Sequence, residues 1–263
     1  MIRAVDAGPV VVEIPHAGLA IDERAAAFTR IPERALRAGA IEEDADFGAD
    51  LVWEGTENAR VTRVVARASR YVIDLNTNPR PPPRPPFYEV DPEPQKIFHR
   101  SQCGVSWVEE GLPRSERERR ITEVLEPYHA AVELELERAR ALHGAVCLVS
   151  AHTFQDRKRA ISDLVLGTQR EQTAPASLRD AVADVARARG FSVALEQPFQ
   201  GGWSLTRHAR PSTGVMGLQI EMARRLVTGP DDRRRAVDAL ALSQLRELAL
   251  AIVGALVASC ARP

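Results

Sequence analysis

The sequence predicts an α/β fold in which helices cover the faces of a largely parallel central sheet. Short β-branched runs alternate along the chain with long stretches rich in Ala, Leu, Glu and Arg, which is the pattern of strand–helix–strand units. Several of the short runs are almost entirely apolar, as expected of central strands that are covered on both sides. The length of 263 residues, 44% of them hydrophobic, fits one large domain or two small ones. We expect a single domain over residues 1–263.

Seven short runs are predicted to be strands because large apolar residues, above all valine, recur in each of them. Turn-forming or polar residues separate them from the helical stretches. In chain order the predicted strands are Pro9–Pro15, Arg60–Ala66, Tyr71–Leu75, Ala145–Ser150, Asp163–Leu166, Phe191–Leu195 and Val215–Ile220.

Four stretches are predicted to be helices because good helix formers dominate them. Pro127 lies inside the second and should kink or divide it. The last overlaps the most apolar part of the chain, Leu248–Cys260, which is shorter than the roughly 20 residues of a membrane span, so we expect a buried C-terminal helix. The predicted helices are Ile31–Ala40 with a second piece up to Trp53, Ser115–Leu142, Ala176–Arg189 and Asp231–Ser259.

Charge and cysteine usage exclude several classes of protein. The 35 Lys and Arg balance 36 Asp and Glu, and the arginines of Arg114–Arg120 alternate with acids, so we expect no nucleic-acid partner. Asp6 and Glu13 interrupt the apolar region that a signal peptide would need. The three cysteines lack CxxC spacing, which argues against a zinc ribbon or a disulfide framework. We expect a cytoplasmic protein that does not associate with membranes.

The segment Pro79–Pro86 (PRPPPRPP) is biased in composition. Such a run forms a stiff polyproline II stretch. We interpret it as a surface loop that shapes the rim of a pocket, and the alternative is a PxxP docking motif for an SH3-like domain.

Two histidines follow apolar runs at the expected ends of strands. His16 comes after Pro9–Pro15, and His152 comes after Ala145–Ser150. Ligands of open α/β sheets collect at the carboxyl ends of strands, although each histidine could instead only bond a loop carbonyl. The acidic cluster Glu42–Asp46 could supply a carboxylate, or simply begin a helix. Two histidines and one carboxylate are a common ligand set for catalytic zinc.

A polar face is also predicted on the last strand. By strand alternation Gly217, Gln219 and Glu221 share one face. Glu221 on that face could act as a general base. The alternative is an ion pair between Glu221 and Arg224 or Arg225.

Arg70 and Asn76 flank the predicted strand Tyr71–Leu75. A guanidinium matches a carboxylate with two donors, and the amide of Asn76 adds a third. These two side chains could therefore hold an acidic substrate. Arg70 could equally pair with Asp74 and be structural.

Eight short blocks occur in an order that resembles the N-formylglutamate amidohydrolase family. The resemblance covers nearly the whole chain, and the ordered series is more specific than any single block. The blocks are Pro15–Gly18, Asp44–Phe47, Ser69–Asn76, Pro127–His129, Ala151–His152, Gln197–Gly202, Thr206–His208 and Leu218–Glu221.

The resemblance implies a phosphorylase/hydrolase-like fold similar to zinc carboxypeptidases and aspartoacylases, with a mixed sheet between helices. It implies that His16, Asp46 and His152 bind one zinc ion per chain and that Glu221 is the general base. It also implies that Arg70 and Asn76 bind a substrate carboxylate, in an enzyme of histidine degradation.

Three departures from the family pattern bear on substrate and metal. Thr77 stands where the family usually has an arginine, and Arg80, Arg84 or Arg207 could substitute for it. Ser150 stands where the family has an aspartate before the histidine, which removes an acid that could orient His152. The Pro-rich segment and the loop around Cys103 replace the usual stretch after Asn76, so the substrate pocket is expected to differ.

The other histidines and the strand cysteine are expected to be structural. His99, His129 and His143 are interpreted as ordinary hydrogen-bonding residues, and Cys147 as a small buried side chain. His208 lies near Gly201–Trp203, which we expect to form a close-packed loop at the mouth of the pocket, with Arg207 able to approach a substrate acid.

The sequence therefore predicts a zinc-dependent amidohydrolase that removes an acyl group, expected to be formyl, from an acidic amino acid such as N-formyl-L-glutamate. Other divalent metals and the oligomeric state stay open. One alternative is a carboxypeptidase- or aspartoacylase-like hydrolase of another small amide. A different class is an inactive binding protein with the same fold.

Overall fold

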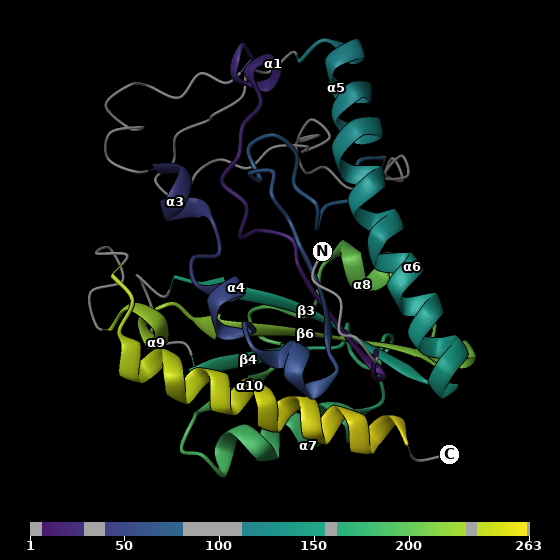
Figure 1. Ribbon diagram of the computed structural model, residues 1–263, viewed down its shortest axis with the longest axis vertical. Helices are drawn as coiled ribbons and strands as arrows, with labels where there is room; N and C mark the ends of the chain where they lie inside the picture. The colour runs from purple at the N-terminus through teal and green to yellow at the C-terminus, as the bar shows by residue number, and fades with distance from the viewer. Residues whose placement is uncertain (1–6, 29–39, 81–111, 156–161, 230–235, 262–263) are drawn as a thin grey trace, which may run out of the picture.

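The structure is a computed structural model that describes residues 7–28, 40–80, 112–155, 162–229 and 236–261 (Figure 1). Its centre is a six-stranded sheet with the order β2-β1-β3-β6-β4-β5. Four neighbouring strands, β2, β1, β3 and β6, are parallel, and β4 turns the direction by pairing antiparallel with β6. The strands are β1 Val10–Ile14, β2 Thr62–Val65, β3 Val146–Phe154, β4 Leu164–Gly167, β5 Val193–Leu195 and β6 Val215–Ala223. The predicted mixed, largely parallel sheet is confirmed.

Six of the seven predicted strands are present, and the prediction at residues 71–75 is wrong. The segment forms turns because its polar groups have side-chain partners instead of a neighbouring strand. The Arg120 guanidinium donates to the carbonyls of Tyr71 and Val72, and the Asp74 carboxylate accepts from the Asn76 N–H at 2.8 Å. An aspartate that bonds the backbone two residues on makes a turn of its own.

The predicted helices are confirmed in part. Residues 115–142 form two helices, α5 and α6, joined by a π-helical turn at Ile121–Leu125, and Pro127 follows that turn at the start of α6. Proline has no N–H and crowds the carbonyl one turn back, which accounts for an irregular turn just before it. Residues 31–39 of the first predicted helix and residues 81–86 of the Pro-rich run lie outside the described residues. The helices are α1 Glu23–Ala26, α3 Ala40–Asp44, α4 Ala49–Val52, α5 Arg114–Arg120, α6 Glu126–His143, α7 Ala176–Arg187, α8 Trp203–His208, α9 Arg225–Thr228 and α10 Ala239–Cys260.

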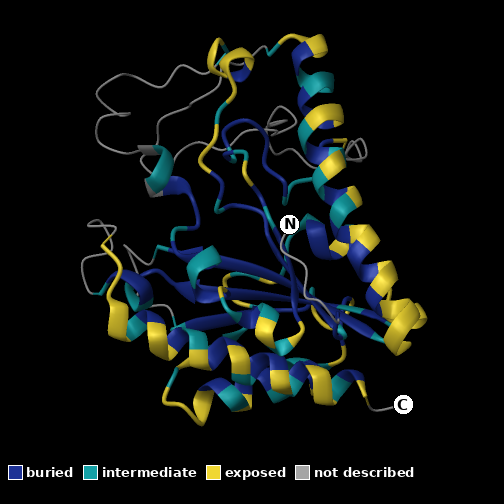
Figure 2. Ribbon diagram, in the orientation of Figure 1, coloured by how far each residue is buried: buried dark blue, intermediate teal, exposed yellow. Residues whose placement is uncertain are grey.

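Helix α10 begins at Ala239, where the Asp238 carboxylate accepts from the N–H groups of Leu240 and Ala241. By length and composition alone it could cross a membrane, and it is the single helix of this kind among the described residues. In the fold one side of it is buried: Leu245, Leu248 and Ile252 join the core beside α7. Figure 2 shows exposed residues along its outer side.

The two faces of the sheet carry separate apolar cores. Val10, Val12 and Ile14 of β1 pack toward α7 and α10, whereas Val11 packs toward α6 on the opposite face. On the α6 face the apolar residues give way to polar ones toward the carboxyl ends of β1, β3 and β6. These three strands are parallel, so their ends meet at one edge of the sheet.

Candidate metal centre and active site

Three segments that are far apart in the sequence bring His16, Asp46 and His152 together. His16 lies just beyond β1, His152 lies in the last part of β3, and Asp46 lies in the turn between α3 and α4. The N–H of Asp46 donates to the carbonyl of His16 at 3.0 Å, which ties this turn to the end of β1. All three side chains are buried.

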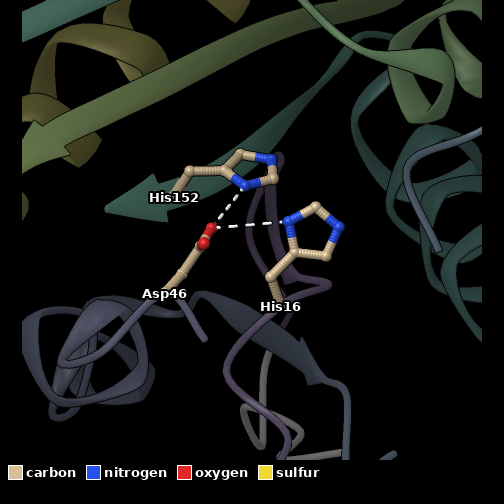
Figure 3. A group of neighbouring side chains, drawn as sticks. All are labelled: His16, Asp46 and His152. Carbon is tan, nitrogen blue, oxygen red and sulfur yellow. Dashed lines mark hydrogen bonds and ion pairs between the residues drawn. The ribbon is translucent and has the colours of Figure 1, made fainter. Parts of the chain in front are cut away.

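Both imidazole rings direct their Nδ1 atom toward the Asp46 carboxylate (Figure 3). Asp46 Oδ2 lies 2.7 Å from His152 Nδ1 and 3.5 Å from His16 Nδ1. The three candidate ligand atoms lie within 4.8 Å of one another. This buried His–Asp–His group could hold a metal ion, and its donor set is one that zinc prefers.

The far nitrogens of both rings have polar partners. His16 Nε2 lies 3.0 Å from Asp74 Oδ1, and His152 Nε2 lies 3.1 Å from the Ser150 hydroxyl. Metal-binding histidines nearly always bond their second nitrogen in this way, which fixes the ring and its tautomer. The surroundings of the histidines therefore fit a metal centre as well as the ligand atoms do.

Charges inside this site shift the pKa values of its members. Burial and Arg70 each lower the pKa of His16, but the carboxylates of Asp74 and Asp46 outweigh them and raise it to about 9. Burial alone would raise the pKa of Asp46, yet His16 and His152 hold it far below its usual range. The site thus favours an ionised carboxylate beside groups that attract protons or other cations.

Glu221 lies on β6 directly across from His152 on β3. Burial raises the pKa of its carboxyl to about 7, against the lowering effect of His152. The Gln219 amide donates to Glu221 Oε1 at 3.0 Å, so these two residues share a face as strand alternation predicts. Arg225, offered as an alternative partner, pairs instead with Asp163 at 2.8 Å. A carboxyl group with a pKa near neutrality can both accept and return a proton.

Arg70 and Asn76 lie on the wall of the cavity. The Arg70 guanidinium pairs with Asp74 Oδ2 at 2.9 Å and lies 3.6 Å from Asp46 Oδ1, so the pairing weighed from the sequence is present. The Asn76 amide oxygen accepts from the Ser204 N–H at 2.9 Å. Its amide nitrogen lies 3.3 Å from His152 Nε2.

Arg207 is not brought to the cavity. Its guanidinium pairs with Glu126 at 2.6 Å and stacks over the Trp203 ring, and it is absent from the described residues that line the cavity. Arg80 pairs with Glu118 at 2.7 Å, and residue 84 lies outside the described residues. Among the described lining residues the one arginine is Arg70.

The site opens into a cavity of about 500 Å³. Its wall includes residues to which the sequence analysis gave no role. Tyr71 donates a hydrogen bond to the Asp44 carboxylate, and the segment after β5 supplies a further wall that includes Phe199 and Gln200. The family block at residues 197–202 was a signal for this wall. The lining residues without a role in the sequence analysis are Tyr71, Thr153, Phe154, Gln155, Pro198, Phe199 and Gln200. Gly201 and Gly202, expected at the mouth of the pocket, also line the cavity, as do Asp44, Thr77 and Gln219.

A second histidine pair, His129 and His208, lies next to the cavity without being among its described lining residues. His129 Nδ1 lies 2.8 Å from His208 Nε2, and His129 Nε2 lies 2.9 Å from the carbonyl of Leu75. Both histidines are buried. Burial lowers the pKa of His129 to about 4 and that of His208 to about 3. These neutral rings link α6 and α8 to the residue that precedes Asn76.

The chain is similar to curated proteins and solved structures over most of its length. It is 28% identical over 231 residues to the N-formylglutamate deformylase of Pseudomonas putida, covering 82% of this chain and 80% of that protein. The corresponding protein of Pseudomonas aeruginosa is 29% identical with the same coverage.

Two crystal structures share the fold. The N-formylglutamate amidohydrolase from Ralstonia eutropha superposes with a TM-score of 0.79 at 25% identity, covering 98% of this chain and 97% of that one. A gene product of Agrobacterium tumefaciens superposes with a TM-score of 0.71 at 22% identity, covering 97% and 92%.

A family model for N-formylglutamate amidohydrolases matches residues 8–228. This match includes all of the His–Asp–His group and Glu221. The chain therefore belongs to the N-formylglutamate amidohydrolase family.

Proposed function

We propose that this protein is a zinc-dependent amidohydrolase that removes the formyl group from N-formyl-L-glutamate or a closely related N-acyl acidic amino acid. The observation that carries the proposal is the buried His16–Asp46–His152 group in the wall of the cavity, in a chain whose relatives carry the name N-formylglutamate deformylase. We place the enzyme in the cytoplasm and assign the activity to one domain over residues 1–263.

In the proposed reaction His16, Asp46 and His152 would hold a metal ion. Bound zinc would polarise the amide carbonyl and lower the pKa of a water molecule in the cavity. Glu221 takes a proton from the attacking water at its carboxylate and returns it to the leaving amine. Gln219 supports this role because its amide donates to Glu221 Oε1 at 3.0 Å, which orients the carboxylate.

Arg70 and Asn76 are the proposed binding residues for the substrate carboxylate. Two nitrogens of the Arg70 guanidinium face Asp74 and Asp46, and the side chain keeps 16% of its surface exposed where it lines the cavity. A substrate carboxylate can approach this exposed part of the guanidinium. Arg207, paired with Glu126, is not retained in this role.

A related substrate is the second candidate, and the observation that favours it is Thr77. This residue lines the cavity where the family usually carries an arginine, so fewer positive charges face the substrate than in its relatives. A hydrolase of another small N-acyl amino acid would use the same metal ligands and the same base.

The test is to measure bound metal in protein purified without a metal-affinity tag, together with hydrolysis of N-formyl-L-glutamate before and after chelation and zinc restoration. We expect about one metal ion per chain and turnover that chelation removes and zinc restores. Metal without turnover on this substrate would favour the second candidate. Protein that neither contains nor takes up metal would contradict the proposed mechanism and favour an inactive binding protein.

A further inference from the structure

Glu13 is a buried carboxylate that the proposed reaction does not use. It lies in β1 with no exposed surface, in register with Ser150 on β3 and Val64 on β2. It is absent from the described residues that line the cavity. A buried carboxylate is costly unless hydrogen bonds satisfy it, so the partners of Glu13 are informative.

The partners of Glu13 form a chain of hydrogen bonds that ends on His152. The Ser150 hydroxyl donates to Glu13 Oε1 at 2.7 Å, and the Tyr128 hydroxyl donates to Glu13 Oε2 at 3.0 Å. The Ser150 oxygen also lies 3.1 Å from His152 Nε2. The hydroxyls of Ser150 and Tyr128 thus satisfy both carboxylate oxygens of Glu13.

The direction of these bonds determines the proton position on His152. A serine hydroxyl can donate one hydrogen bond, and Ser150 donates it to the Glu13 carboxylate. Ser150 can then only accept, so the partner it favours is a protonated Nε2 of His152. With a proton held on Nε2, the ring stays neutral when a metal ion replaces the proton that Nδ1 shares with Asp46 Oδ2 at 2.7 Å.

Asn76 makes the opposite demand on the same ring nitrogen. Its amide oxygen is held by the Ser204 N–H at 2.9 Å, so its NH₂ group is turned to His152 Nε2, at 3.3 Å. A donor at this place favours an unprotonated Nε2. The Ser150 contact with Nε2, at 3.1 Å, is the shorter of the two. The Ser150 proton is committed to the Glu13 carboxylate at 2.7 Å, a charge-assisted bond that is stronger than a neutral one.

His16 has the equivalent partner without an intermediary, since its Nε2 lies 3.0 Å from the Asp74 carboxylate. Both rings therefore have a carboxylate behind them, one in direct contact and one through a hydroxyl. Ser150 stands where an aspartate was expected from the family pattern, and β1 supplies a carboxylate from the adjacent strand.

We propose that Glu13 and Ser150 are positioning residues for the metal centre: acting through Ser150, Glu13 holds His152 with its proton on Nε2 and its Nδ1 free to bind the metal. This inference rests on the proposed metal function. The proposed role of Glu13 and Ser150 is to raise the affinity for the metal ion, and neither residue is assigned a contact with the substrate.

The experiment measures zinc and cobalt affinity by competition with a chromophoric chelator, in wild type and four variants whose folding is checked by circular dichroism. Glu13→Gln and Ser150→Ala should each weaken binding about 10- to 100-fold, the usual effect of losing an outer partner of a metal ligand. Thr62→Val is the matched control, because it removes a buried hydroxyl that has no hydrogen-bond partner in the described part of the chain. It should leave affinity unchanged.

The double variant Glu13→Gln/Ser150→Asp places a carboxylate next to His152 directly and should restore most of the affinity. A second readout is the His152 Nε2–H proton signal in zinc-loaded protein labelled with ¹⁵N-histidine. It should be slow to exchange in wild type and fast in Ser150→Ala. A merely structural role of Glu13 would lower stability without moving either readout.

Two outcomes separate the inference from the proposed function. If wild type binds metal and Glu13→Gln and Ser150→Ala bind it equally well, the positioning role is wrong and the metal function stands. If wild type itself binds no metal, the proposed function fails and the inference fails with it.

Discussion

At the scale of single residues, Glu221 is the sharpest test of the proposed chemistry. Glu221→Gln keeps the size of the side chain and an oxygen for the Gln219 amide, but it cannot carry a proton. We expect kcat to fall by about 10²- to 10⁴-fold and bound metal to remain. Steady-state kinetics and metal analysis on the same sample check this. A fully active Glu221→Gln would show that another group moves the proton.

Gly202 is a second residue whose role can be isolated. A Cβ atom at this position would lie 2.3 Å from Asn76 Oδ1 and nearer still to its Nδ2, so Gly202→Ala must displace Asn76. We expect kcat/KM to fall about tenfold or more, as small misplacements in an active site do.

Gly254→Ala is the control for this substitution, because nothing lies within 4 Å of the added Cβ. It lies inside helix α10, where alanine should stabilise the protein by about 0.5–1 kcal/mol and leave kinetics unchanged. Wild-type kcat/KM in Gly202→Ala would contradict the assignment of Asn76 to substrate binding.

At the scale of elements, the segment between β2 and α5 shows where sequence patterns mislead. The residues after Arg70 are as apolar as a buried strand, and Val72 and Ile73 are indeed buried. What makes them turns is Arg120, more than forty residues later, whose guanidinium binds the carbonyls of Tyr71 and Val72. Such long-range partners of backbone groups cannot be read from local periodicity.

Arg120 should therefore contribute strongly to the stability of the turns at residues 71–75. It is fully buried and also pairs with Glu116 at 2.8 Å, so Arg120→Ala leaves a buried carboxylate and several carbonyls with fewer donors. We expect a loss of about 3–5 kcal/mol in the free energy of unfolding, measured by urea denaturation. Arg187→Ala in α7 removes the partner of Asp184 in an ion pair whose two side chains are both exposed and should cost no more than about 1 kcal/mol. Equal effects would mean that Arg120 is dispensable.

At the scale of the whole molecule, the His129–His208 pair makes stability depend on pH. Both pKa values are lowered in the folded state, so between about pH 6.5 and 4 the unfolded chain binds more protons. The contribution of the neutral histidines to the free energy of unfolding is fully present above pH 6.5 and is lost as the pH falls. For His129, whose pKa is shifted from 6.5 to about 4, this contribution is about 3 kcal/mol.

His208→Gln keeps an N–H donor for His129 and removes one titrating ring, so its urea midpoint should fall less steeply over this pH range than that of wild type. Comparing the two slopes cancels the contribution of the carboxylates, which titrate in both proteins. Identical slopes would show that the buried pair does not take up protons on unfolding.

The whole-molecule arrangement was largely predictable, and the reasons are physical. Strand ends, alternation on β6 and the ordered family blocks indicated His16, His152 and Glu221, because backbone periodicity and sheet topology control where these side chains lie. Arg207 was assigned to the cavity on its place in a family block. Its pairing with Glu126 depends on how α6 packs against α8, which the sequence does not encode locally.

The order of strands in the sheet also bears on folding during synthesis on the ribosome. Strand β1 ends at residue 14, and its neighbour β3 begins at residue 146. At the usual rate of synthesis the first strand waits on the order of ten seconds before its partner leaves the ribosome. During that time the run VVVEI has an unpaired edge on the β3 side. The candidate ligands His16 and Asp46 are likewise synthesised long before His152, so the proposed metal centre can form only after residue 152 has been translated.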